Sequence, residues 1–146
     1  ATTEIYTLSL HDALPISDFT DLRNNHWGYS IILKAVERGI IQGYPDGTIR
    51  PDQPISRAEV SALFARLWDK PLNADKNVTQ FPDVSPKSWY AEAVFRLSRA
   101  GLLTGMASGL FLPDKPMTRA EAAVLIDRFI QLYGQAQDEQ DISKNA

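Results

Sequence analysis

The chain has no cysteine, and it has only two histidines among its 146 residues. Without cysteine there is no disulfide, no thiol nucleophile and no thiolate ligand for a metal. His11 lies in the first seventeen residues, so His26 is the single histidine of the remainder. That argues against a histidine-based metal site or catalytic pair. We therefore expect no bound metal, no cofactor and no enzymatic activity.

Long hydrophobic runs and a strong charge of one sign are also missing. No apolar run approaches the length needed to cross a bilayer, so we expect no membrane span. The net charge of −3 is too small to favour nucleic acid as a partner, and we expect none. The contents of 44% hydrophobic and 23% charged residues are those of an ordinary globular protein.

What the chain does have is an internal repeat. Phe19–Trp68 aligns without a gap onto Phe81–Ile130, 62 residues further on, with 14 identical positions. A fixed period makes the module the unit of structure, and a unit of about 50 residues buries too little surface to be stable alone. We divide the chain into module 1 (18–69), a linker (70–80), module 2 (81–133) and a flexible acidic tail (134–146).

The first seventeen residues have no counterpart before module 2. Back-translated, Ala1–Ile16 matches a standard short-read sequencing adapter, and its last base can begin the codon of Ser17. We interpret 1–17 as an adapter-derived artefact and leave it out of the reasoning on fold and function, as is done for expression scars. The alternative is a genuine amphipathic leader.

Each module predicts a helix, a structured loop and a second helix, which makes the chain all-α. Apolar residues recur at a helical period from Trp27 to Val36, and again from Trp89 to Leu97. Gly39 and Gly101 follow at the position where a helix usually ends. The loop of module 1 contains Pro45-Asp-Gly47, a tight-turn signal.

The second helix of each module begins with a capping box, formed by Ser56 and Glu59 in module 1 and by Thr118 and Glu121 in module 2. Arg57 and Arg119 stand at the first helical position, where a cation faces the positive end of the helix dipole. Either each arginine helps to bind an anion there, or it pairs with an acid of a neighbouring loop, such as Asp21 or Asp83.

Several further residues are candidates for ligand contact. Trp27 and Trp89 either pack in the core or offer an aromatic platform to a sugar ring. Tyr44, Asp46 and Gly47 lie on the loop of module 1, where recognition residues concentrate. The acidic residues nearby do not have the alternating spacing of a calcium loop, so no metal site is expected there.

These motifs together resemble the S-layer homology (SLH) family. Module 1 matches its motifs in Phe19-Thr-Asp-Leu22, Trp27, the loop Gly39–Pro51 and Ser56-Arg-Ala-Glu59. Module 2 matches them in Phe81-Pro-Asp-Val84, Trp89, the segments Gly101–Gly105 and Gly109–Pro113, and Thr118-Arg-Ala-Glu121. Module 2 departs from the family pattern where the Tyr-Pro-Asp part of the loop is absent.

The resemblance implies a non-catalytic, extracellular module of the cell wall or S-layer. Its partner would be a secondary cell-wall polysaccharide attached to peptidoglycan, often pyruvylated. The grooves would lie between neighbouring modules, and the arginines of the capping boxes, here Arg57 and Arg119, would contribute to them. Two modules would form an incomplete pseudo-threefold helical bundle, which an additional SLH module or a homo-oligomer would complete. The rival prediction is a helical scaffold for protein–protein interaction or self-association.

Overall fold

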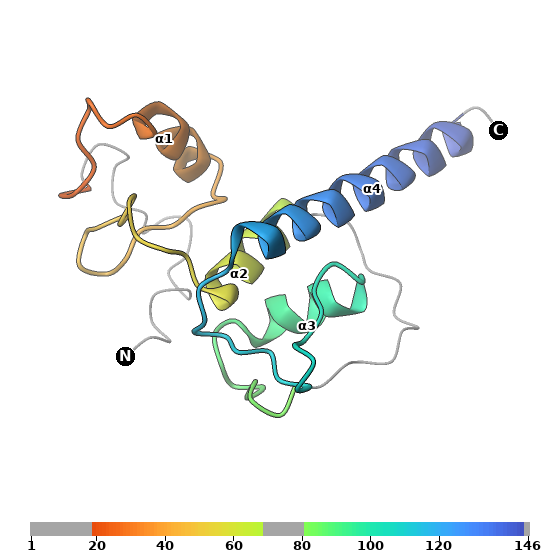
Figure 1. Ribbon diagram of the computed structural model, residues 1–146. Coiled ribbons are helices and arrows are strands. Elements are labelled where there is room, and N and C mark those ends of the chain that lie inside the picture. The colour runs from red at the N-terminus through yellow and green to blue at the C-terminus, as the bar shows by residue number, and fades with distance from the viewer. Residues whose placement is uncertain (1–18, 69–80, 145–146) are drawn as a thin grey trace.

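The protein is described by a computed structural model covering residues 19–68 and 81–144, in which every regular element is a helix (Figure 1). The helices are α1 (Tyr29–Glu37), α2 (Arg57–Leu67), α3 (Ala91–Arg99) and α4 (Arg119–Lys144). This confirms the all-α prediction. The segments expected as an adapter-derived start (1–17) and as a linker (70–80) lie outside the described residues.

The first helix of each module ends at the glycine predicted to stop it. Gly39 and Gly101 have φ values of 69° and 74°, a conformation that side chains disfavour. The N–H of Gly39 donates to the Val36 carbonyl at 2.9 Å, as the N–H of Gly101 does to Ser98 at 3.0 Å. These bonds use the last carbonyls of the helix and turn the chain into the loop.

The core lies mainly in module 2, with α2 of module 1 packed against it. Helices α2 and α3 are in direct contact, while α1 lies apart from the other three (Figure 1). The phenylalanine rings of α2 and α4, Phe64 and Phe129, meet edge to face at 5.2 Å. The buried hydrophobic cluster consists of Val60, Phe81, Val84, Ala91, Val94, Leu97, Leu102, Leu103, Phe111 and Leu125.

Helix α4 is longer than the repeat predicts. It continues to Lys144, and its C-terminal half projects away from the other helices (Figure 1). This differs from the flexible tail expected over 134–146, because Gln, Ala and Glu after Gly134 are strong helix formers. No helix in the described part of the chain is both long and apolar enough to cross a membrane.

Candidate functional site

An aspartate at the start of each module holds the loop of that module. The Oδ1 and Oδ2 atoms of Asp21 accept hydrogen bonds from the N–H groups of Ile49 and Arg50 at 2.8 and 2.7 Å. Asp83 accepts from the N–H groups of Phe111 and Leu112 at 2.9 and 2.7 Å. This aspartate clamp shapes the loop of each module, and the clamped residues Ile49 and Arg50 line one of the two candidate sites.

The clamp supports a left-handed backbone at the same loop position in both modules. Arg50 has a φ of 52° and Leu112 a φ of 58°, values that non-glycine residues adopt only at an energetic cost. Burial raises the pKa of the Asp83 carboxyl, but backbone hydrogen bonds, first those of Phe111 and Leu112, together with the nearby charge of Arg57 outweigh it and hold that pKa below its ordinary value. The charged form of Asp83 is therefore part of the native loop.

Both second helices begin with the two hydrogen bonds of a capping box. The side chain of Ser56 accepts from the Glu59 N–H at 3.2 Å, and Glu59 accepts from the Ser56 N–H at 2.8 Å. Thr118 and Glu121 form the same pair at 3.2 and 2.8 Å. Each box satisfies two N–H groups that the helix start would leave without a partner.

The two arginines of the capping boxes have different surroundings. Arg57 is 4% exposed and inserts into module 2, where its Nε and Nη2 donate to the carbonyls of Phe111 and Thr104 at 2.7 and 3.0 Å. Its Nη1 lies 3.5 Å from a carboxylate oxygen of Glu121. Burial lowers the pKa of Arg57, while Glu121 and Asp83 oppose that shift. Arg57 is thus held by two carbonyls of module 2 and by Glu121 of the α4 capping box, whereas the acid suggested as its partner was one of a neighbouring loop, such as Asp21 or Asp83.

Arg119 is exposed, unlike its counterpart. Among residues 19–68 and 81–144, no hydrogen bond or ion pair of its side chain is found. The segment before it is fixed against module 1: Arg57 and Ala58 donate their N–H groups to the carbonyls of Lys115 and Pro113, both at 2.9 Å. The start of α4 is therefore held in place with its arginine directed away from the core.

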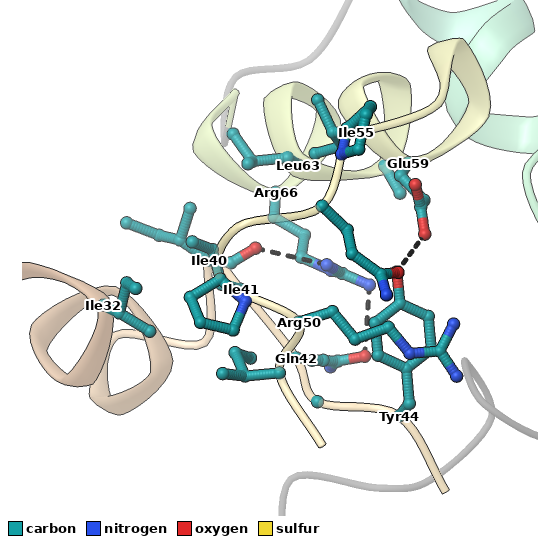
Figure 2. A pocket seen from close by; sticks show the side chains of 16 residues that line it. Ile32, Ile40, Ile41, Gln42, Tyr44, Arg50, Ile55, Glu59, Leu63 and Arg66 are labelled. Atoms are coloured by element: carbon teal, nitrogen blue, oxygen red, sulfur yellow. Dashed lines mark hydrogen bonds between the residues drawn. The ribbon is translucent and has the colours of Figure 1, made fainter. Parts of the chain in front are cut away.

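A pocket of about 300 Å³ lies in module 1 between the loop and α2; we call it the loop pocket (Figure 2). Its apolar lining consists mainly of Ile32, Ile40, Ile41, Ile49, Ile55 and Leu63. Arg66 reaches across one side, donating to the Ile40 carbonyl at 3.2 Å and to the Gln42 side chain at 3.1 Å (Figure 2). Such a lining suits an apolar side chain better than a sugar.

The predicted loop residues gather at the rim of this pocket. The hydroxyl of Tyr44 donates to the Glu59 carboxylate (Figure 2), and the Arg50 guanidinium lies 3.8 Å above the Tyr44 ring. Asp46 forms an ion pair with Arg50 at 3.2 Å and accepts from the Thr48 hydroxyl and N–H. Hydrogen bonds from Thr48 and Arg50 keep the pKa of Asp46 below its ordinary value despite the opposing effect of desolvation.

The positive φ of Gly47 shapes the turn of this loop. Its φ is 79°, and an added Cβ would meet nothing within 4 Å, so the positive φ is what requires glycine here. Gly43 is required for a different reason, because a Cβ there would lie 2.3 Å from Cε1 of Phe19. The loop therefore depends on glycine at both positions.

A second cavity, of about 210 Å³, lies between α2 of module 1 and α3 of module 2; we call it the interhelix groove. Alanines form much of its surface, and Trp89, Arg66, Arg96 and Glu92 add one aromatic ring and one net positive charge. Arg96 is held by hydrogen bonds to the carbonyls of Trp68 at 2.6 Å and Ala65 at 3.4 Å. An aromatic face beside cations suits an anionic sugar.

The repeated tryptophans have separate environments. Trp89 is partly buried in the interhelix groove, and its ring meets Tyr90 edge to face at 5.2 Å. Trp27 is 89% exposed and stacks on His26 at 5.6 Å, so it is not a core residue. His26 in turn lies 3.0 Å from a carboxylate oxygen of Asp52. Within the described residues no three acidic or histidine side chains converge as a metal site would require.

The family to which these modules belong follows from a comparison with protein-family models. The model described as the S-layer homology domain matches residues 18–61 and 80–123. The chain belongs to the S-layer homology family. The two matches fall on the two copies of the repeat, so each module is one SLH domain.

Curated relatives include several surface proteins of bacteria. The chain is 30% identical over 130 residues to cell surface glycoprotein 1 of Acetivibrio thermocellus, covering 83% of this chain and 6% of that protein. It is 35% identical over 104 residues to the cellulosome-anchoring protein of the same organism, covering 70% and 23%. The surface-layer 125 kDa protein of Lysinibacillus sphaericus is 31% identical over 118 residues, covering 80% and 10%. The chain thus spans less than a quarter of the length of these relatives.

Sequence reasoning missed three features of these sites. It did not identify Asp21 and Asp83 as loop clamps, the groove arginines Arg66 and Arg96, or the loop pocket. The aspartates carried a usable signal, since both modules place one two residues after a phenylalanine. Arg66 and its counterpart Arg128 are also identical between modules, and each donates to the carbonyl of a loop residue.

Proposed function

We propose that this chain is a non-catalytic, extracellular anchoring module of the cell wall or S-layer. Its ligand is an anionic, pyruvylated secondary cell-wall polysaccharide attached to peptidoglycan. SLH family membership supports the anchoring role, as does the name of the cellulosome-anchoring relative. The observation that carries the choice of ligand is the interhelix groove, where Trp89 lies beside Arg66 and Arg96.

The groove has the two features that an anionic sugar requires. The Trp89 ring lines the groove and offers an apolar face against which a sugar ring stacks. Arginine recognises a carboxylate through several N–H donors in one plane, so a pyruvate ketal would be held by Arg66 or Arg96. Because the two helices come from different modules, the ligand also bridges the modules.

The remaining predicted residues take supporting parts in this proposal. Tyr44, Asp46 and Gly47 form an outer contact on the module 1 loop, with Trp27 as an exposed aromatic platform on the same module. Arg57 acts on the ligand indirectly, by fastening the module 2 loop, since its guanidinium is buried. The exposed Arg119 is not part of the groove.

The test is co-sedimentation with purified cell-wall sacculi, before and after chemical removal of pyruvate. We expect Trp89→Ala to weaken binding at least about tenfold, in line with the loss of a central aromatic contact. Trp27→Ala is the matched comparison at the same repeat position and should weaken binding less, because no second helix among the described residues lies beside Trp27. Binding that is unchanged both by Trp89→Ala and by removal of pyruvate would refute the proposal.

A second candidate function is self-association. The observation in its favour is the set of large apolar side chains left exposed just before α1, on α1 and on α4. Trp27 and Ile31 are 89% and 66% exposed, while Ile126 and Ile130 on α4 are 48% and 63% exposed. Apolar surface on two separate elements of one chain is typical of a protein that binds another protein or its own copy.

A further inference from the structure

One face of α2 covers module 2. This contact is the template for an equivalent contact on module 1. Arg57, Val60 and Phe64 follow one another on that face at helical spacing and pack on the module 2 core. Beneath them, Val94 and Phe111 are fully buried and Leu102 is 1% exposed. The start of a second helix is therefore what seals an SLH module in this chain.

Module 1 has the same surface without that cover. Its equivalents of Val94 and Leu102 are Ile32 and Ile40, which are only partly buried and line the loop pocket. Helix α1 has no buried residue, whereas α3 buries Ala91, Val94 and Leu97. The loop pocket therefore lies on the surface of module 1 that corresponds to the surface of module 2 covered by α2.

The start of α4 has the sequence to fill such a place. It repeats the box of α2, with Arg119 in the position of Arg57 and Ile126 in that of Phe64. Both side chains are exposed, and so is Val124 on the same stretch of helix. The sequence that covers a module therefore occurs twice in the described residues, and in its second copy the residues equivalent to Arg57 and Phe64 are exposed.

The hydrogen-bonding groups correspond as well. Arg57 donates its side-chain N–H groups to the carbonyls of Thr104 and Phe111, whose equivalents in the loop pocket are Gln42 and Ile49. The backbone N–H groups at the start of α2 donate to Lys115 and Pro113. Their equivalents, Gln53 and Pro51, also line the loop pocket, and neither carbonyl accepts a hydrogen bond from a described residue.

We infer that the start of α4 from one copy of the chain docks into the loop pocket of a second copy. Arg119 then donates to the carbonyls of Gln42 and Ile49 and lies near Glu59, as Arg57 lies near Glu121. The same chain does not fill its own pocket, because Pro113–Met117 is already paired with Ile55–Ala58. This inference rests on the self-association offered above as a second function, and it specifies how the copies meet.

The docked contact is similar to the template but not identical. Ile49 replaces Phe111, so the ring that lies 4.7 Å from the Arg57 guanidinium has no counterpart. Ile31 and Val124 replace the small Ala93 and Ala62, so α1 and α4 pack further apart than α2 and α3 do. Each copy offers one α4 start and one pocket, which makes the association head-to-tail, leading to rings or open chains.

The experiment is analytical ultracentrifugation of the whole chain between about 1 and 200 µM, a range that detects micromolar association. We expect the mass to rise above 16.3 kDa as the concentration rises. Arg119→Glu should weaken association at least about tenfold, since it reverses a charge in a closed contact. Lys87→Glu makes the same kind of charge change on an exposed loop of module 2 and should leave association unchanged.

Mixing two variants tests the head-to-tail geometry directly. Ile31→Asp changes only the module 1 side of the contact, on α1 next to the pocket residue Ile32, and Ile31 is 66% exposed and so tolerates a polar side chain. Neither Ile31→Asp nor Arg119→Glu should associate alone, whereas an equimolar mixture should form a complex of two chains through its one intact contact. Circular dichroism confirms that both variants are folded.

A chain that stays monomeric at every concentration would overturn both the self-association and this contact. Association that survives Arg119→Glu, or variants that fail to complement each other, would overturn the contact while leaving self-association in place. Co-sedimentation with sacculi, repeated on Arg119→Glu, keeps the glycan proposal separate: polymer binding should persist in a variant that no longer self-associates.

Discussion

The Nε atom of Arg57 donates a 2.7 Å hydrogen bond to the carbonyl oxygen of Phe111. This bond joins the first residue of α2 in module 1 to the loop of module 2. The same arginine adds a bond to Thr104 and an ion pair with Glu121, so one side chain fastens three parts of module 2. The contact makes module 2 dependent on a helix that the sequence assigns to module 1.

Arg57→Ala should lower the free energy of unfolding by about 2–4 kcal/mol, because it leaves the buried Phe111 carbonyl without its donor and removes one of the two cations beside Glu121. Arg119→Ala is the matched control and should stay within about 0.5 kcal/mol of the unmodified chain, because Arg119 is exposed. Urea denaturation measures both. Equal effects of the two substitutions would mean that the buried contact contributes nothing to stability.

Asp83→Asn should lower the free energy of unfolding by about 1–2 kcal/mol at neutral pH, since it removes a charged acceptor from two backbone N–H groups. The pKa of Asp83 is lowered in the folded chain, so its stabilisation is present above the ordinary pKa of 3.8 and is lost as pH falls through the lowered value. Denaturation from pH 7 to pH 2 should show the gap between the two proteins closing in acid. A gap that stays constant would contradict the role of the charge.

Gly105→Ala should destabilise the chain by about 1–3 kcal/mol, because the new Cβ would lie 2.7 Å from Cε1 of Phe81 and 3.1 Å from the Leu110 carbonyl oxygen. Gly134→Ala should have the opposite effect on stability. Gly134 lies within α4, and an added Cβ would meet nothing within 4 Å, so the substitution should stabilise the chain by about 0.5–1 kcal/mol. Thermal melts of the two variants decide whether steric contact or helix propensity governs each position.

Binding to the wall polymer should weaken as salt rises from about 0.05 to about 0.5 M, since salt screens charges that are open to solvent. Arg96→Gln should bind more weakly and depend less on salt, because it removes one of the two cations of the interhelix groove. Co-sedimentation at several salt concentrations gives both quantities. Binding that is indifferent to salt would point to stacking alone.

The helices and their ends could be predicted because their signals are local. Gly39 and Gly101 stop their helices through their own backbone conformation. Ser56 and Glu59 form their two hydrogen bonds within four residues of chain. Such features depend on residues that are neighbours in sequence, and a repeat that shows each of them twice makes them easier to recognise.

The partners of Arg57 and the fate of the tryptophans could not be predicted, because they depend on which module covers which. Arg57 and Arg119 occupy the same position in two capping boxes that differ only in Ser56 and Thr118, yet Arg57 is buried and Arg119 is exposed. Trp27 and Trp89 likewise occupy the same repeat position, but within residues 19–68 and 81–144 a second helix lies beside Trp89 alone. A similar local sequence gives no information on contacts with the other module, such as that between Arg57 and Phe111.

The position of α2 means that the repeat and the folding unit are out of phase. By sequence α2 closes module 1, but Val60 belongs to the buried cluster of module 2. Cutting the chain between the modules would therefore strip module 2 of its lid, and would yield two damaged halves instead of two small domains. Adding a module by tandem duplication would not have this effect, because each new copy would supply the helix that covers the module after it.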